Sequence, residues 1–444
     1  MPQATYHFPR GFLWGTATAA HQVEGNNTNN QWWHFEEAGH TNGRSGLACD
    51  WWGGRWREDF DRAVEDGQNA HRFSVEWSRI QPEPDRWDED ALDRYRAMLR
   101  GLKERGMTPM VTLHHFSDPI WLYENCGWEK EEVVPLFEKF VRKTVEALKE
   151  YCTLWTTINE PNVYALMGYV TGDFPTCKDG HSGLSAAMQV MANMLRGHAA
   201  AYHAIHEIQP EARVGYAHHY RPMVPRSAWN PLDRLMRNMR YNGLNMAFPT
   251  GISTGVMKTP VGKFKIPEAK DTQDYFGLNY YSVDTVWFDW RNRKEMFIGS
   301  GYPKEADLSS TGFIANIPEG IFQSLKWITR TYPDTPIIIT ENGVEDTGDG
   351  MRPRYLVEHL HQIWRAVNFN WPIKGYFHWT LVDNFEWERG WTQRFGLWAL
   401  DVETQKRTKR PSAELYAEIC KENSISSEMV EKYCPEVMDK LFPV

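Results

Sequence analysis

Eight short apolar runs divide the chain, and each is followed by a helical segment or a long connection. The runs occupy residues 12–23, 70–77, 109–116, 154–159, 214–220, 275–281, 336–340 and 373–380. Apolar residues at three- and four-residue steps indicate amphipathic helices at 91–106, 132–151, 186–208 and 354–369. Strands that alternate with helical crossovers are typical of a parallel sheet.

The number of runs selects the architecture. Eight parallel strands close a (β/α)8 TIM barrel, and 444 residues leave room for enlarged strand-to-helix loops. A doubly wound open sheet is the alternative, but the stretch after the first strand, GTATAAHQVEG (15–25), is not a glycine-rich phosphate loop. We therefore predict an α/β fold with a single catalytic barrel domain over residues 1–444. Residues 421–444 should form a C-terminal helical tail that packs on the barrel or, alternatively, contacts a second subunit.

Composition limits the partners. The chain has 49 Lys and Arg against 58 Asp and Glu, a net charge of −9, and no long run of like charges. This balance gives no reason to expect a nucleic-acid or membrane partner. The six cysteines are too sparse for a disulfide scaffold, so we expect free thiols and a cytoplasmic location. A homo-oligomer remains possible.

Two of the predicted strands end in a glutamate. Glu160 follows LWTTIN (154–159), and Glu341 follows PIIIT (336–340). Barrel enzymes place their chemistry at the carboxyl ends of the strands. Two carboxylates facing one cavity can divide the work of glycoside hydrolysis between a protonated acid and an ionised nucleophile or base. A single glutamate at such a place could simply cap a helix, so the prediction depends on the pair.

Other strand ends supply partners for these carboxylates. Arg72 ends the second run, and a guanidinium beside a carboxylate keeps it ionised, although a structural ion pair is the alternative. Tyr281 ends the sixth run and could hydrogen-bond the same carboxylate. The 21 tryptophans suit a sugar site, because indoles stack on pyranose rings. The histidine pairs at 114–115, 218–219 and 359/361 show no zinc-binding spacing, so no metal is expected.

The motifs resemble glycoside hydrolase family 1, a family of retaining β-glucosidases and β-galactosidases. The resemblance runs from Phe8 to about Ile419. It is carried by FPRGFLWGTATAAHQVEG (8–25), HRFSVEWSRI (71–80), TTINEP (156–161), LNYYS (278–282), ITENG (339–343) and WTLVDNFEWERGWTQRFG (379–396). The family's fold is the barrel that the strand count also predicts.

The resemblance implies roles for individual residues. It makes Glu160 the acid/base and Glu341 the nucleophile, with Arg72 and Tyr281 as partners of the nucleophile and Asn279 as a motif position near the acid. The implied substrate-binding residues are Gln22, His115, Phe116, Asn159, Trp379, Glu386, Trp387 and Phe395, with Asn159 on the sugar 2-hydroxyl and Trp379 beneath the ring.

Two positions bear on the choice of sugar. The family usually has tryptophan after the histidine that is His115 here, whereas this chain has Phe116, which lacks the indole N–H donor. The carboxylate of Glu386 would repel a 6-phosphorylated sugar. We therefore expect a glycone site that takes unphosphorylated sugars with reduced discrimination among them.

The expected activity is that of a retaining exo-β-glycosidase without a cofactor. It would hydrolyse short or aryl β-glucosides, and also β-fucosides or β-galactosides, through a covalent glycosyl-enzyme intermediate. A transglycosidase would use the same intermediate and is the alternative. A non-catalytic sugar-binding protein is a third possibility, but it predicts the loss of one carboxylate, and both are present.

Overall fold

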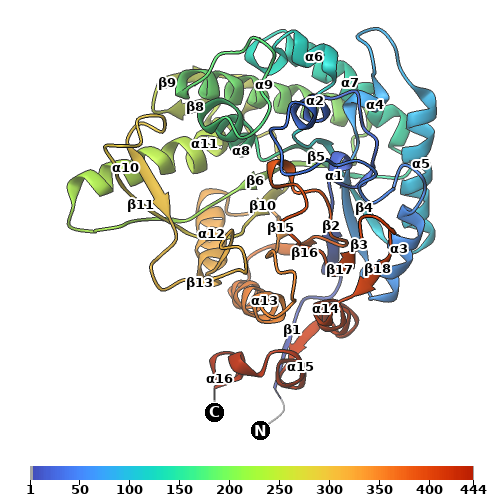
Figure 1. The fold of residues 1–444 in the computed structure, drawn as a ribbon, viewed down its shortest axis with the longest axis vertical. Coiled ribbons are helices and arrows are strands. Elements are labelled where there is room, and N and C mark those ends of the chain that lie inside the picture. The colour runs from blue at the N-terminus through green and yellow to red at the C-terminus, as the bar shows by residue number, and fades with distance from the viewer. Residues whose placement is uncertain (1–3, 444) are drawn as a thin grey trace.

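The eight expected strands form a closed parallel barrel. The computed structural model describes residues 4–443 (Figure 1). In barrel order the strands are β2 (Leu13–Ala17), β3 (Ala70–Ser74), β4 (Thr108–His114), β5 (Leu154–Asn159), β6 (Arg213–His219), β10 (Phe276–Asn279), β15 (Ile337–Asn342) and β16 (Ile373–Trp379), which pairs back to β2. The predicted (β/α)8 fold is confirmed.

The first run is only partly a strand. Residues 12–23 are buried nearly throughout, but β2 ends at Ala17 and the chain then forms the short helix α1 (Ala20–Val23). The backbone N–H of Ala20 donates to Ser74 Oγ at 2.7 Å, which turns the chain out of the sheet. An apolar run shows burial, but its pattern does not separate a strand from a buried helical turn.

The helices surround the barrel and match the four predicted amphipathic segments. These are α5 (Glu89–Glu104), α7 (Val133–Leu148), α9 (Leu184–Ile208) and α13 (Arg352–Asn368). Asp88 caps the first of them by accepting from the backbone N–H of Ala91 at 2.9 Å. Further helices of eight residues or more are α3 (Trp56–Glu65), α10 (Pro231–Tyr241), α11 (Ala247–Thr254), α12 (Glu319–Thr331) and α14 (Pro411–Glu422).

The largest elaboration lies between β6 and β15. A three-stranded sheet of β12 (Ile298–Gly301), β11 (Asp284–Phe288) and β7 (Met223–Pro225) packs against α10. Met223, Met236, Val286 and Ile298 form a small apolar cluster there that is separate from the barrel core. Figure 1 shows α10 and β11 at one side of the molecule, away from both termini.

The two ends of the described chain lie together. Strand β1 (Thr5–His7) pairs antiparallel with β19 (Ser424–Ser426), and the tail continues through α15 (Ser427–Tyr433) and α16 (Met438–Leu441). The Tyr6 ring stacks on Phe442 with centroids 4.6 Å apart and contacts Trp364 of α13. The tail therefore packs on the N-terminal strand and on α13.

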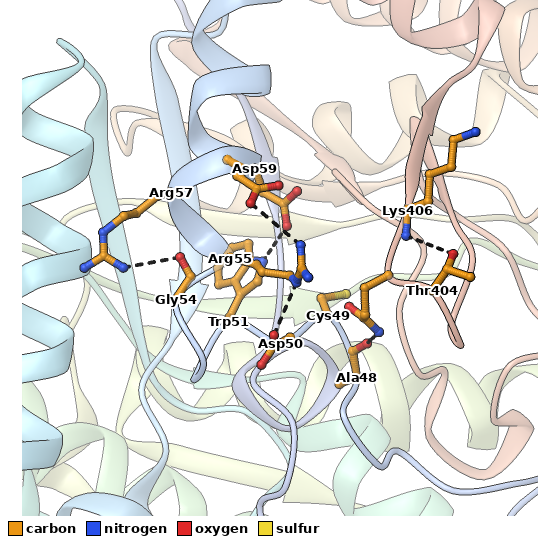
Figure 2. Close-up of polar contacts among 12 residues, drawn as sticks. Ala48, Cys49, Asp50, Trp51, Gly54, Arg55, Arg57, Asp59, Thr404 and Lys406 are labelled. Carbon is orange, nitrogen blue, oxygen red and sulfur yellow. Dashed lines mark hydrogen bonds and ion pairs between the residues drawn. The ribbon is translucent and has the colours of Figure 1, made fainter.

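A buried polar network attaches the loop before α3 to the C-terminal part of the chain. Figure 2 shows Trp51 directed at Asp59 and Arg55 directed at Asp50 in this loop. Asp59 also forms a fully buried ion pair with Arg407 at 3.1 Å. The Cys49 thiol donates to the carbonyl of Asp383 at 3.4 Å, in the segment that carries Trp379 and Glu386. The loop thus supports one wall of the site described below.

The expectation of six free cysteines is wrong for two of them. Cys126 and Cys177 form a disulfide across 51 residues of sequence, whereas Cys49, Cys152, Cys420 and Cys434 are free and buried. Sequence spacing does not show which loops meet in space, so this pair was not evident. Within residues 4–443, no helix is long and apolar enough to span a membrane.

Candidate active site

Glu160 and Glu341 lie at the carboxyl ends of barrel strands and face one cavity of about 250 Å³. Glu160 follows β5 directly, with a φ of 41°, and precedes helix α8 (Pro161–Leu166); Glu341 is the fifth residue of β15. Both side chains are buried. Gly343 follows on the same strand end, where a Cβ atom would collide with the carbonyl oxygen of Trp379. Glycine at this position therefore allows the chain after β15 to pack closely against the end of β16.

Arg72 and Tyr281 both contact Glu341. The Arg72 guanidinium pairs with one Glu341 oxygen at 2.6 Å, and the Tyr281 hydroxyl donates to the other at 2.8 Å. Arg72 is completely buried and is held from behind by Thr112 Oγ1 at 3.0 Å. Burial keeps the Tyr281 pKa well above its ordinary value, so the phenol remains a donor.

Glu160 has different partners. Its Oε1 accepts from Asn279 Nδ2 at 2.7 Å and contacts His219 Nδ1 at 3.2 Å. Asn279 is in turn oriented by the Thr340 hydroxyl, which donates to its side-chain oxygen at 2.6 Å. No arginine or lysine of the described residues pairs with Glu160. The two carboxylates are therefore chemically distinct, because a permanent positive charge touches only Glu341.

Asn159 connects the two halves of the site. Its side-chain oxygen accepts from Arg72 Nη2 at 2.7 Å and from Asn279 Nδ2 at 3.2 Å. A continuous set of contacts thus runs from Glu341 through Arg72, Asn159 and Asn279 to Glu160. Because these side chains project from the barrel strands or directly follow them, their relative positions are fixed by the barrel itself.

Burial shifts several pKa values in the cavity. The pKa of Glu341 is raised to about 7, because desolvation by burial and the nearby Glu160 raise it by more than Arg72 and Tyr281 lower it. The pKa of Glu386 rises to about 8 because of burial and the neighbouring Glu388 and Glu341. Burial and the charge of Arg72 hold the His115 pKa well below its ordinary value, so this imidazole is neutral.

Aromatic rings form the rest of the inner cavity. The His115 ring stacks on Trp379 and on Trp387, each with centroids 5.9 Å apart, and Phe116 meets Trp387 edge-on at 5.2 Å. The Phe395 ring meets the Tyr281 ring edge-on, with centroids 6.3 Å apart. Apolar faces therefore stand beside polar groups, as a sugar ring requires.

The structure brings the thirteen sequence-predicted residues together, but not all of them line the cavity. Ten do so, whereas Gln22, Arg72 and Asn279 lie behind the wall. Gln22 Nε2 donates to the carbonyl of Phe385 at 2.6 Å and to Glu386 at 3.2 Å. Gln22 therefore contacts Glu386, and its Oε1 has no hydrogen-bond partner in the protein; its place on a sugar hydroxyl stays a prediction.

Sequence reasoning missed His219 and the outer wall. His219 was noted only as one of a histidine pair, although its place at the end of β6 is the signal that identified the other site residues. The outer wall has no such signal, because its residues come from helices and loops that are distant in sequence and do not end a barrel strand. They include Met167, Phe174, Arg221, Arg240, Leu244 and Tyr302.

One group of potential metal ligands occurs among residues 4–443. The ligand atoms of Cys126, Glu129 and Cys177 lie within 4.8 Å of one another. Both sulfur atoms are already joined in the disulfide, so no thiolate is available there. The group lies outside the cavity that holds Glu160 and Glu341.

The comparisons with known proteins identify the family. The family model for glycosyl hydrolase family 1 matches residues 4–425. The chain belongs to glycosyl hydrolase family 1. This membership confirms the resemblance seen in the sequence and makes the protein a glycoside hydrolase.

Individual family 1 members are similar over nearly their whole length. Beta-glucosidase A of Thermotoga maritima is 33% identical, with 94% of this chain and 98% of the relative covered. The structure of a beta-glycosidase from Pyrococcus horikoshii is 35% identical with a TM-score of 0.89, covering 97% of this chain and 98% of that one. The T. maritima family 1 β-glucosidase solved with isofagomine lactam is 30% identical with a TM-score of 0.88, covering 95% and 100%.

Proposed function

We propose that the protein is a retaining exo-β-glycosidase that hydrolyses β-glucosides, and also β-fucosides or β-galactosides, with Glu341 as nucleophile and Glu160 as acid/base. The observation that carries this assignment is the Arg72 ion pair, which touches Glu341, whereas no arginine or lysine of the described residues pairs with Glu160. A nucleophile must be ionised, whereas an acid must hold a proton.

The first step forms a glycosyl-enzyme. A carboxylate oxygen of Glu341 attacks the anomeric carbon while Glu160 donates its proton to the glycosidic oxygen, so the carbon–oxygen bond to the leaving group breaks and the aglycone departs as an alcohol. In the second step Glu160 removes a proton from water, the water oxygen attacks the same carbon, and Glu341 leaves as a carboxylate. Two inversions give net retention.

The electrostatics of the pair support this order of events. Two neighbouring buried carboxyls do not both ionise easily, which is one cause of the raised pKa of Glu341. The Arg72 guanidinium and the Tyr281 hydroxyl stabilise the charge on Glu341, which is the form that a nucleophile needs. Once Glu341 is esterified its charge disappears, so Glu160 has no charged carboxylate beside it when it takes the proton from water.

The inner wall supports binding of an unphosphorylated sugar. Neutral His115, Asn159 and Glu386 offer polar atoms to hydroxyls, and Trp379 and Trp387 offer apolar faces. Above about pH 8, where Glu386 is ionised, its charge on this cavity disfavours a phosphate dianion. Phe116 has no N–H to donate, which supports activity on more than one sugar.

The configuration of the first product tests the proposal. An aryl β-glucoside followed by proton NMR from the first turnover should release the β-anomer before mutarotation produces the α-anomer. Initial release of the α-anomer would show inversion and contradict the assigned roles. The same experiment with an added alcohol measures transfer against hydrolysis.

We propose a cytoplasmic location on the basis of the four free buried cysteines. In that reducing compartment the Cys126–Cys177 pair would be open, and thiol alkylation of rapidly quenched cells followed by mass spectrometry would show both residues modified. A fully oxidised pair in cells would contradict this location.

A further inference from the structure

Charge is distributed very unevenly along the chain. Residues 221–304 contain 13 basic and seven acidic side chains, a net charge of +6, whereas the other 360 residues contain 36 basic and 51 acidic side chains, a net charge of −15. The overall charge of −9 hides this difference. The positive segment is the elaboration that carries β7, α10, β11 and β12.

Exposed apolar side chains concentrate in the same segment. Of the ten large apolar side chains exposed among residues 4–443, seven lie between residues 224 and 297. Trp229 is 94% exposed and Trp290 is 65% exposed, and the outer side of α10 adds Leu232 and Leu235. Large exposed indoles have a high solvation cost and usually mark a surface that contacts something else.

These residues belong to one part of the fold. Asp233, in the first turn of α10, accepts from the backbone N–H of Phe288 at 3.0 Å and from that of Ser227 at 3.2 Å. The loop that carries Trp229 and the turn that carries Trp290 therefore meet at Asp233. We call the exposed side chains of residues 226–235 and 290–293 the α10–β11 surface.

The arginines of the α10–β11 surface have no acidic partner. At its base, Arg221 and Arg240 pair with Asp284, at 2.9 Å and 3.6 Å. By contrast, no ion pair among residues 4–443 involves Arg234, Arg291 or Arg293, which are all exposed. The surface thus presents unneutralised guanidinium groups beside exposed indole and leucine side chains.

This combination fits an anionic lipid surface. Tryptophan prefers the interface between lipid and water, and arginine is attracted to acidic headgroups. The strongly negative remainder of the molecule is repelled by the same headgroups, so only one orientation is favourable. Figure 1 shows α10 and β11 at the periphery of the fold, where a flat surface can reach them.

The α10–β11 surface adjoins the active site. Met223, Arg240, Leu244 and Tyr302 of the same segment line the outer part of the active-site cavity. A second cavity of about 50 Å³ shares Leu166, Arg240 and Leu244 with it. This second cavity is lined mainly by apolar side chains, including Met188, Met239, Met296 and Ile298. An apolar aglycone would therefore find a matching environment between the catalytic pair and the inner face of α10.

We propose that the α10–β11 surface docks on anionic lipid surfaces and that the enzyme takes β-glycosides with an apolar aglycone from them. The proposed docking is argued only from the charges and the exposed apolar side chains of the α10–β11 surface. The substrate class rests on the proposed glycosidase function.

Co-sedimentation with vesicles tests the docking. The protein should bind vesicles of phosphatidylcholine mixed with phosphatidylserine, dissociate from them at high salt, and bind vesicles of phosphatidylcholine alone much less.

Variants of the α10–β11 surface should weaken this binding. Arg234→Gln together with Arg291→Gln should lower the partition coefficient roughly 25-fold, at roughly fivefold for each charge. Trp229→Ser together with Trp290→Ser should also lower it. Lys326→Gln with Arg330→Gln, exposed residues of α12, is the matched control and should leave binding unchanged.

Activity and assembly measurements separate the possible failures. All variants should hydrolyse a soluble aryl β-glucoside at the parental rate, whereas the arginine and tryptophan variants should lose activity on a long-chain alkyl β-glucoside held in anionic vesicles. Vesicle binding without any glycosidase activity would overturn the proposed function and leave the docking intact. Glycosidase activity without vesicle binding would overturn the docking. A dimer that the arginine variant converts to a monomer, with no vesicle binding, would assign the surface to a second copy of the chain instead.

Discussion

The inner end of the cavity and its outer wall are built on different supports. Arg72, Asn159 and Glu341 project from barrel strands, are buried, and hydrogen-bond one another or shared partners. The outer wall includes Arg221 and Arg240, which are partly exposed and belong to an elaboration with its own small apolar cluster. The catalytic side chains are therefore positioned by the barrel, whereas the outer wall is positioned in part by an elaboration with an apolar cluster of its own.

The largest effect should come from the acid/base. Glu160→Ala should reduce kcat/KM by roughly 100- to 10,000-fold for substrates with poor leaving groups, because these need protonation. For activated aryl glycosides, the same variant should form the glycosyl-enzyme at close to the parental rate, because their leaving groups need little protonation. Glu388→Ala, on the outer part of the same cavity, is the control and should affect both substrate types equally and weakly. Equal losses on both substrates for Glu160→Ala would remove the distinction between the inner end and the outer wall.

The next effect concerns the ion pair. Arg72→Met should lower kcat/KM by roughly 100- to 1,000-fold, because Glu341 loses the cation that favours its ionised form. Without that cation the pKa of Glu341 rises further, so the acidic limb of the pH–rate profile should move to higher pH. Arg352→Met removes another fully buried arginine, paired with Asp349, and should reduce stability without moving that limb. An unchanged profile in Arg72→Met would contradict the assignment.

A third prediction uses stability. Burial raises the pKa of Glu386 from its ordinary value near 4.5 to about 8, so the folded protein binds a proton that the unfolded chain has released. This contribution to stability is present below pH 4.5 and is lost as pH rises to about 8, at roughly 1.4 kcal/mol for each unit of pKa shift. Glu386→Gln should flatten the decrease in the thermal midpoint over this range. A midpoint that falls as steeply in the variant would show that Glu386 is not protonated in the folded state.

The smallest effect concerns Phe116. If an indole there donates to a sugar hydroxyl, Phe116→Trp should raise kcat/KM for β-glucosides relative to β-galactosides by roughly 2- to 13-fold, the worth of one neutral hydrogen bond. The ratio of kcat/KM for a β-glucoside to kcat/KM for a β-galactoside, measured in the parent protein and in the variant, tests this prediction. Strict glucoside preference in the parent protein, with no change in the variant, would show that this position does not set the choice of sugar.

The part of the site that the sequence predicted is the part that strands carry. Glu160, Glu341, Arg72 and Tyr281 stand at or near the ends of apolar runs, and parallel strands bring such ends to one face. His219 has the same kind of position and was missed only because its neighbour suggested a metal pair. The contact of Gln22 with Glu386 was not predicted, since motif matching does not show side-chain direction.

The remaining features depend on contacts between distant loops. The Cys126–Cys177 disulfide joins segments whose proximity no local pattern encodes. The outer wall is assembled from several connections, among them residues 221–304, whose positive charge is cancelled in the total by the acidic remainder. Averaging charge over the whole chain therefore hides the positive segment on which the proposed docking rests.

The central claim is that Glu341 forms the covalent intermediate. Glu341→Gly removes the nucleophile and leaves space for a small anion beside Arg72. With an activated aryl β-glucoside and added azide, we expect restored turnover and an α-glucosyl azide as the product, since one displacement now replaces two. No rescue together with residual β-product, or a β-glucosyl azide from this variant, would contradict it.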